Sequence, residues 1–227
     1  MSTPVTPLLL SLQVAAISTS IVFLFGLLLA RLMTRRHFFG KHLLESFFLL
    51  PLVLPPTVVG FGLLFLFGKN GFLGKWLEEW FGVTVVFSLA GAVIASIVVS
   101  FPLMYQSAVA AFSGVDRRLE DAARTMGASE WRLFWTVSLP LAWPGLLAGF
   151  VLSFARGLGE FGATLMLAGY IPGKTDTIPV AIYFAVEAGQ TDTALFWVVI
   201  IVALGIGTTY WLNWWSRRNM RRYTNNP

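Results

Sequence analysis

Residues 8–30 read LLLSLQVAAISTSIVFLFGLLLA, a stretch that contains no charged side chain. A helix needs about 20 consecutive apolar residues to cross the roughly 30 Å hydrocarbon core of a bilayer. Basic residues follow the stretch, beginning with Arg31, and none precedes it. A secretory signal peptide has the reverse charge order and a shorter apolar segment. The stretch therefore predicts a retained transmembrane helix.

Four further segments meet the same requirement for length and apolar character. They bring the number of expected spans to five, and they run approximately over residues 46–67, 87–111, 141–166 and 194–215. Shorter helices are expected on the outer side, over residues 71–81 and 177–189. No repeat or linker divides the sequence, so we expect a single transmembrane domain over residues 1–227.

The composition indicates that lipid is the main solvent. Of the 227 residues, 56% are hydrophobic and 12% are charged, and the mean hydropathy is +0.74. Soluble domains carry about 25% charged residues, roughly twice this fraction. We therefore expect an all-α integral membrane protein: a bundle of about five transmembrane helices with a cytoplasmic loop and short external helices. The chain has no cysteine, which excludes disulfides and thiolate metal sites, and no metal site is expected.

The basic residues cluster beside the spans, which favours membrane orientation over nucleic-acid binding as the reason for the net charge of +5. Twelve lie in segments expected on one side: Arg31, Arg35, Arg36, Lys41, Arg117, Arg118, Arg124, Arg132, Arg217, Arg218, Arg221 and Arg222. The other connections hold three: Lys69, Lys75 and Lys174. Basic loops stay in the cytoplasm. This bias predicts an external N-terminus, with Thr3 outside, and a cytoplasmic C-terminus, with Asn225 inside.

The cytoplasmic segment 112–140 has the pattern of two helices joined at a glycine. Asp116 is a candidate N-cap for the first helix, and Gly127 is its expected stop. Ser129 is a candidate cap for the second helix, which is expected to end at Pro140. The first helix carries apolar positions at i, i+3, i+4 and i+7 and a set of charges that could frame a contact with a partner: Leu119, Ala122, Ala123 and Met126, with Arg117, Arg118, Glu120 and Arg124. An amphipathic loop lying on lipid headgroups is the alternative to a docking site for a partner protein.

The spacing within this segment resembles the EAA loop of permease subunits of ABC importers. The matching pattern is Asp121-Ala122-Ala123, three residues, Gly127, nine residues, then Val137-Ser138-Leu139-Pro140. The family has Glu at the first position and Ile in place of Val, and Glu120 keeps an acid next to Asp121. The resemblance implies a coupling helix that sits in a cleft of the ATP-binding subunit. The residues it assigns to coupling are Glu120, Asp121, Ala122, Ala123, Gly127, Leu139 and Pro140.

Two other stretches, LPLVLPPTVVG over residues 50–60 and GLGEFGAT over residues 157–164, are similar to the molybdate permeases of this family and more loosely to sulfate and tungstate permeases. The resemblance implies a molybdate importer in the bacterial inner membrane. It implies a homodimer of this chain, two copies of an ABC ATPase and an external oxyanion-binding protein. The chain itself has no Gly-x-x-x-x-Gly-Lys-Ser/Thr motif, so we expect it to be no enzyme, to hold no cofactor and to leave ATP to the partner.

Several residues within the spans are candidates for a translocation path or gate. Three prolines, at positions 51, 55 and 56, remove backbone donors in the second span, which either breaks the helix beside a cavity or merely kinks it for packing. Gly157, Gly159 and Gly162 permit either close helix packing or a gate. The candidates are Pro55, Pro56, Thr57, Ser100, Arg156, Gly159, Glu160 and Thr164.

Arg156 and Glu160 are the charged residues expected inside the membrane, four positions apart on one helix. Such charges are expensive in lipid and are usually functional, although a structural ion pair is the alternative. A carboxylate repels a dianion, so Glu160 fits a gate better than a substrate ligand. Neutral donors such as Thr57, Ser100 and Thr164 suit a transit path, unless they bond to their own helix.

Two other classes of protein compete with the importer. An ion-coupled secondary transporter or channel would have several embedded carboxylates or a repeat, and it would leave the pattern from Asp121 to Pro140 unexplained. A membrane assembly factor that transports nothing would need neither the proline-rich span nor the embedded charges.

Overall fold

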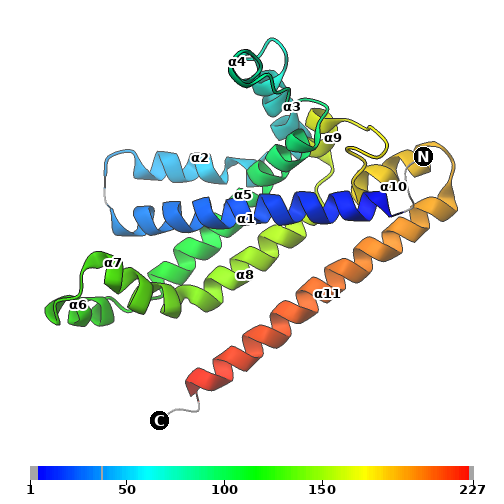
Figure 1. The fold of residues 1–227 in the computed structure, drawn as a ribbon. Coiled ribbons are helices and arrows are strands. Elements are labelled where there is room, and N and C mark those ends of the chain that lie inside the picture. Colours follow the sequence, from blue (N-terminus) through cyan, green and yellow to red (C-terminus); the bar gives the residue numbers. More distant parts are fainter. Residues whose placement is uncertain (1–4, 37, 225–227) are drawn as a thin grey trace.

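The computed structural model describes residues 5–36 and 38–224, and this part of the chain is all helix, without strands (Figure 1). Thr3 and Asn225, which the orientation prediction names, lie outside the described residues. The elements are α1 (Thr6–Arg35), α2 (Lys41–Val53), α3 (Pro56–Phe67), α4 (Phe72–Phe81), α5 (Leu89–Ser113), α6 (Arg117–Thr125), α7 (Glu130–Leu133), the π-helical turn η1 (Phe134–Ser138), α8 (Leu139–Leu158), α9 (Gly162–Ala168), α10 (Ile178–Glu187) and α11 (Thr191–Thr224).

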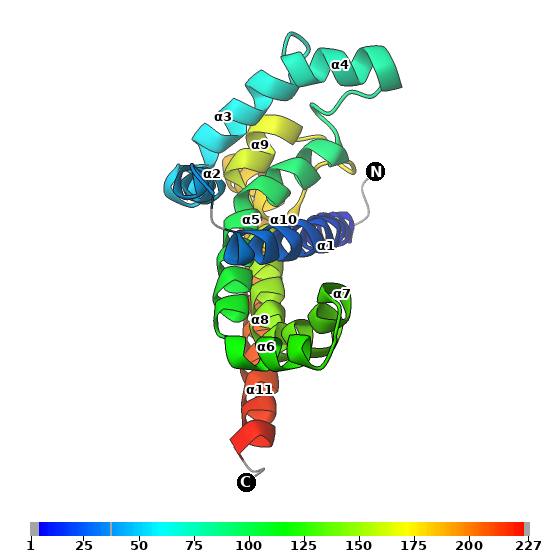
Figure 2. The ribbon, with the colours of Figure 1, turned by 90° about the vertical axis from the view of Figure 1, so that its left-hand side faces the viewer.

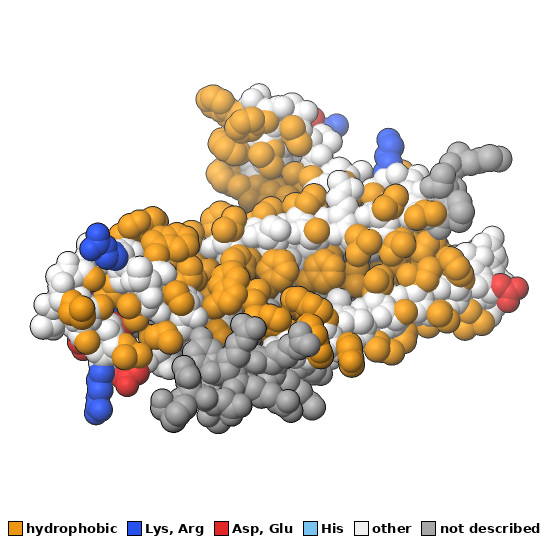
Figure 3. Space-filling model, turned by 60° about the horizontal axis from the view of Figure 1, so that its bottom comes forward, with side chains coloured by type: hydrophobic (Ala, Val, Ile, Leu, Met, Phe, Trp, Pro, Cys, Tyr) orange, Lys and Arg blue, Asp and Glu red, His pale blue; other side chains and the backbone are white. Residues whose placement is uncertain are grey.

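Four continuous helical segments are long and apolar enough to cross a membrane: Thr6–Arg35, Leu89–Ser113, Glu130–Leu158 and Thr191–Leu212. The pair α2 and α3 makes a fifth candidate span if its two helices are counted together. Hydrophobic side chains cover much of the surface in Figure 3, and the few charged side chains lie at its edges. The expected all-α bundle of about five spans is therefore confirmed, as are the short helices α4 and α10.

The centre of the fold is the crossing of α1, α5 and α8, as Figures 1 and 2 show. Small side chains allow this crossing, since the hydroxyls of Ser18 and Ser96 lie 2.9 Å apart in the buried interface of α1 and α5. A Cβ on Gly157 of α8 would lie 2.7 Å from the Ser96 Oγ. Real Cβ atoms do not approach so closely, so Gly157 is required for packing at this point.

The second expected span, residues 46–67, is two helices that meet at an angle of 114°. The residue before a proline is restricted to extended backbone. Leu54 and Pro55 each precede a proline, and both are extended, with ψ of 142° and 138°. The predicted break is confirmed, and the alternative of a kinked but continuous helix is wrong.

The fourth expected span, residues 141–166, has different limits in the structure. Its helix begins earlier, because α7, η1 and α8 follow one another without interruption from Glu130. The expected end of the loop helix at Pro140 is therefore wrong: Pro140 lies in the first turn of α8, where a missing N–H is tolerated. The span also ends earlier, at Leu158, and Met166 belongs to the separate helix α9.

Candidate coupling loop and membrane break

The loop between α5 and α8 has the local structure that its capping residues predict. The Asp116 carboxylate accepts a hydrogen bond of 2.9 Å from the Arg118 N–H at the start of α6. Gly127 has a φ of +83°, a conformation that side chains other than glycine adopt rarely. The Ser129 hydroxyl accepts a bond of 3.3 Å from the Arg132 N–H at the start of α7. The helix, glycine corner and second helix are therefore confirmed.

Glu120 is buried, with 4% of its surface exposed, and it points into the protein. Its Oε1 accepts a 3.1 Å bond from Arg31 and a 2.5 Å bond from the Ser138 hydroxyl, and Arg35 forms a second ion pair with it. The expectation that Glu120 frames a contact with a partner is therefore wrong. Burial of the carboxylate is tolerated because three donors from α1 and η1 satisfy it.

Arg31 completes this cluster by joining all its elements. Its Nη2 donates a 2.9 Å bond to the Ser138 hydroxyl, and its guanidinium carbon lies 5.5 Å from the ring centres of both Phe112 and Phe134. Burial raises the pKa of the Glu120 carboxyl, but hydrogen bonds from Ser138 and Arg31 and the nearby positive charges outweigh it. The net pKa of Glu120 lies below its ordinary value, so the carboxylate stays charged and ties α6 to α1 and η1.

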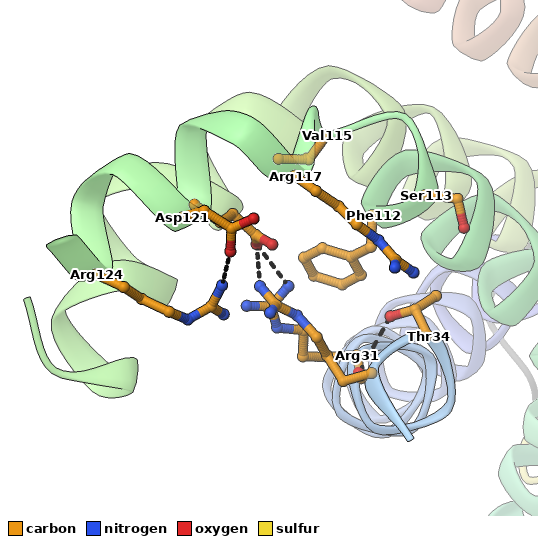
Figure 4. Close-up of a pocket in the computed structure, with 10 residues that line it drawn as sticks. Arg31, Thr34, Phe112, Ser113, Val115, Arg117, Asp121 and Arg124 are labelled. Atoms are coloured by element: carbon orange, nitrogen blue, oxygen red, sulfur yellow. Dashed lines mark hydrogen bonds and ion pairs between the residues drawn. The ribbon is translucent and has the colours of Figure 1, made fainter. Parts of the chain in front are cut away.

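Arg124 fastens α6 to α7 across the glycine corner. Its guanidinium lies 2.7 Å from Asp121 Oδ1 and 2.6 Å from Glu130 Oε1 (Figure 4 shows the bond to Asp121). The hydrogen bond with Glu130 is the main cause of a raised pKa of Arg124. Asp121 is 70% exposed in its side chain, so it is the acid of the pair 120–121 that faces outward.

One exposed stripe of α6, continued by its C-cap Met126, is apolar. Met126 is 88% exposed and Leu119 is 50% exposed, and Ala122 between them is also exposed. Large apolar side chains are normally buried on an amphipathic helix of this kind. The remaining predicted coupling residues are divided: Gly127 and Pro140 are exposed, Ala123 is half-buried, and Leu139 packs against the core formed by α1, α5 and α8.

Glu160 and Arg156 form the predicted ion pair, with 2.6 Å between Glu160 Oε2 and Arg156 Nη1. The sequence suggested that both residues lie on one helix, and this is wrong, because α8 ends at Leu158. Glu160 is 3% exposed, and its Oε1 accepts a 2.8 Å bond from the Ala163 N–H in the first turn of α9. The glutamate therefore caps α9 while it neutralises an arginine of α8.

The break in the second span and the break after α8 lie against each other. A Cβ on Gly162 would lie 3.1 Å from Pro56 Cβ, and a Cβ on Gly60 would lie 2.7 Å from Ala163 Cα. Helices α3 and α9 are thus in backbone contact at the two glycines (Figure 2 shows them side by side). The structure therefore brings Pro56 and the segment that follows Glu160 together.

The other path candidates are placed less favourably. Pro55 and Thr57 are exposed beside the break, whereas Thr164 is buried in α9. The Ser100 hydroxyl bonds to the Ser96 carbonyl of its own helix at 2.5 Å, as in the alternative considered for it. Gly159 is exposed, and the nearest atom to an added Cβ would be 3.7 Å away, so packing among the described residues does not require glycine there.

Sequence reasoning missed the roles of Arg31, Arg35 and Ser138. The two arginines were counted only as orientation charges, and Ser138 only as part of a motif. Their contacts with Glu120 join residues 89 and 18 positions apart, which spacing within a helix cannot reveal. The amphipathic pattern of α6 was the signal that could have indicated the burial of Glu120. On this helix Glu120 lies away from the apolar stripe made by Leu119, Ala122 and Met126.

Residues 22–222 match the model of the family described as binding-protein-dependent transport system inner membrane component. The chain therefore belongs to this family, which makes it a multi-pass inner-membrane subunit of a transport system and not an enzyme.

Individual relatives match over almost the whole chain. The putative molybdenum transport system permease protein YvgM of Bacillus subtilis (strain 168) is 53% identical, with 88% of each chain covered. The molybdenum transport system permease protein ModB of Escherichia coli (strain K12) is 46% identical, with 94% of each covered. Among solved structures, an inward-facing form of the methionine ABC transporter MetNI superposes with a TM-score of 0.70 at 17% identity, over 96% of this chain and 99% of that one. This last likeness confirms the fold alone.

Proposed function

We propose that the chain is the permease subunit of an ATP-driven importer that carries molybdate into the cytoplasm. The single observation behind this choice is the identity of 46% and 53% to two relatives named for molybdenum transport, maintained over at least 88% of both chains. Tungstate and sulfate are chemically similar oxyanions, and they remain the alternatives that the experiment must separate.

The proposed mechanism begins at the outer face of α6. An exposed apolar surface next to water is unfavourable, so Leu119, Ala122 and Met126 are suited to a partner's cleft. That partner is a separate ATPase, because this sequence has no phosphate-binding loop of its own. The family resemblance implies two copies of it. A second copy of this chain and an external oxyanion-binding protein complete the assembly that we propose.

The cluster around Glu120 connects the partner contact on α6 to the membrane-spanning helices. Motion of α6 is passed to α1 through Arg31 and Arg35, and to η1 and α8 through Ser138. Helix α8 has 20 residues, which at 1.5 Å per residue gives about 30 Å. It therefore carries displacement from the loop to Arg156 and Glu160, beside the contact of α3 with α9. The proposed orientation, with α6 in the cytoplasm, follows from the twelve-to-three distribution of basic residues.

The test is ATP hydrolysis by the complex reconstituted in lipid with its ATPase and binding protein. We expect the molybdate-loaded binding protein to stimulate hydrolysis and drive uptake, and the sulfate-loaded form to do neither. Stimulation by sulfate alone, or by tungstate alone, would reassign the substrate. Uptake without the ATPase, driven by an ion gradient, would instead support a secondary transporter.

A further inference from the structure

A pocket of about 340 Å³ lies between the end of α1, the end of α5 and helix α6 (Figure 4). Six of the residues that line it carry charge: Arg31, Arg35, Arg117, Arg124, Glu120 and Asp121. Four arginines and two acids give this lining a formal charge of +2. Glu130, which pairs with Arg124 at the edge, lowers the sum to +1. The pocket therefore carries surplus positive charge.

The surplus is located at Arg117. Glu120 already neutralises part of the charge of Arg31 and Arg35, and Asp121 is engaged with Arg124. No acidic side chain among the described residues forms an ion pair with Arg117. Arg117 is thus the arginine of this pocket that has no acid of its own.

The direction of the Arg117 side chain decides where the surplus positive charge lies. It extends from the start of α6 past the Phe112 ring toward Thr34 near the end of α1 (Figure 4). Arg117 lines the same pocket as Arg31 and Arg35, and in the view of Figure 4 the Phe112 ring lies between its guanidinium and that of Arg31. The guanidinium groups of Arg31, Arg35 and Arg117 share this pocket with one carboxylate, that of Glu120. A further anion in the pocket would therefore reduce the repulsion that remains between the guanidinium groups. Planar guanidinium groups match the oxygens of a phosphate, to which they donate pairs of hydrogen bonds.

We propose that this pocket binds a phosphate group that pairs with Arg117, with Arg31 and Arg35 also lining the pocket. The pocket lies at the ends of α1 and α5 that carry the basic clusters, where the headgroups of the cytoplasmic leaflet lie in the proposed orientation. Basic pockets at this level between spans bind anionic lipid headgroups. A phosphatidylglycerol headgroup and free inorganic phosphate are the two sources of this chemistry.

The experiment measures the melting temperature of the full-length chain in detergent during titration with phosphatidylglycerol, with phosphatidylcholine and with inorganic phosphate. Three proteins are compared: the native chain, Arg117→Gln and Arg118→Gln. Arg118 is the matched control, because it is the adjacent residue on the same exposed turn and does not line the pocket. The chain is used without its ATPase, so nucleotide sites do not contribute, and failure of this proposal would leave the proposed docking function untouched.

We expect a stabilising anion whose apparent affinity falls about tenfold or more in Arg117→Gln, since one charge-assisted pair of bonds is lost. The Arg118→Gln variant should titrate like the native chain, and Arg117→Lys, which keeps the charge but not the fork, should be intermediate. Stabilisation by phosphatidylglycerol alone identifies the lipid, and stabilisation by inorganic phosphate identifies the free anion. Equal effects of the Arg117 and Arg118 substitutions, or no stabilisation by either anion, would overturn the proposal.

Discussion

The Glu120 carboxylate and the Arg31 guanidinium are 89 positions apart in the chain and 3.1 Å apart in the fold. The contact places the loop of residues 112–140 against the first span, and Ser138 extends the contact to the helix that becomes the fourth span. The loop is thus joined to two spans by buried polar contacts, which is the connection that the proposed coupling to an ATPase requires.

Glu120→Ala should destabilise the protein, because it leaves two arginines without their carboxylate. Removing one partner of a largely buried pair costs several kcal/mol, and the partial exposure of Arg35 reduces this to about 2–3 kcal/mol. The melting temperature in detergent measures the loss. Asp121→Ala is the control, since its exposed pair with Arg124 is worth about 1 kcal/mol or less.

The same carboxylate predicts a dependence on pH. The pKa of Glu120 is lower in the folded protein than in the unfolded chain, so its contribution to stability is complete above the ordinary value of about 4.3. It is lost as the pH falls through the lower folded-state pKa. The difference in melting temperature between the native chain and Glu120→Gln should therefore shrink in acid. A difference that grows as the pH falls would contradict the assignment.

Gly127→Val should abolish association with the ATPase while the chain still inserts in the membrane. No atom lies within 4 Å of the position of a Cβ there, so the penalty is the φ of +83°, which β-branched residues strongly disfavour. Gly127→Asn should retain association, because asparagine tolerates this conformation. Gly189→Val imposes similar strain at φ +71° outside the loop. Copurification with the ATPase is the readout, and equal loss in both valine variants would indicate general destabilisation.

Met126→Glu should weaken ATPase binding without lowering the melting temperature of the isolated chain. The side chain is 88% exposed, so a charge there disturbs no internal packing, but it would enter an apolar interface. Thr125→Glu adds the same charge at the neighbouring exposed position, about 100° around the helix, and should have a smaller effect. Full ATPase binding and uptake by Met126→Glu would remove the support for docking through this face.

Glu160→Gln should make ATP hydrolysis less dependent on the loaded binding protein. Glutamine keeps an oxygen for the Ala163 N–H but removes the charge that Arg156 requires, which weakens the closed arrangement of α8, α9 and α3. Basal and stimulated hydrolysis are measured with the melting temperature. A loss of stability with normal coupling would assign Glu160 a structural role, and an unchanged protein would leave it without either role.

Single cysteines at Thr3 and Asn225 should be labelled from opposite sides of the membrane, with Thr3 outside. The native sequence contains no cysteine, so each label reports one position. The prediction rests on the distribution of basic residues. Labelling of both positions from the same side would show that the number of spans is wrong.

Local chemistry in the sequence was sufficient to predict the approximate positions of the spans, the caps at Asp116 and Ser129, and the corner at Gly127. These features depend on neighbouring residues, so periodicity and capping rules reach them. The burial of Glu120 and the separation of Glu160 from α8 depend on side chains supplied by other segments or on where a helix stops. Residue type alone could not distinguish Glu120 from Asp121, although one is buried and the other is exposed.

Because of the π-helical turn Phe134–Ser138, the number of residues in the motif determines the direction in which the loop leaves the axis of α8. A π turn holds about one residue more than an α turn, and each residue of an α-helix advances the direction of its side chain by about 100°. One residue fewer in this turn would restore regular helix and swing the preceding loop by about that angle around the axis of α8. Ser138 and Glu120 would then no longer face each other. The fixed number of residues between Gly127 and Pro140 therefore sets the phase of the loop relative to the span, and a change of length would matter as a change of angle.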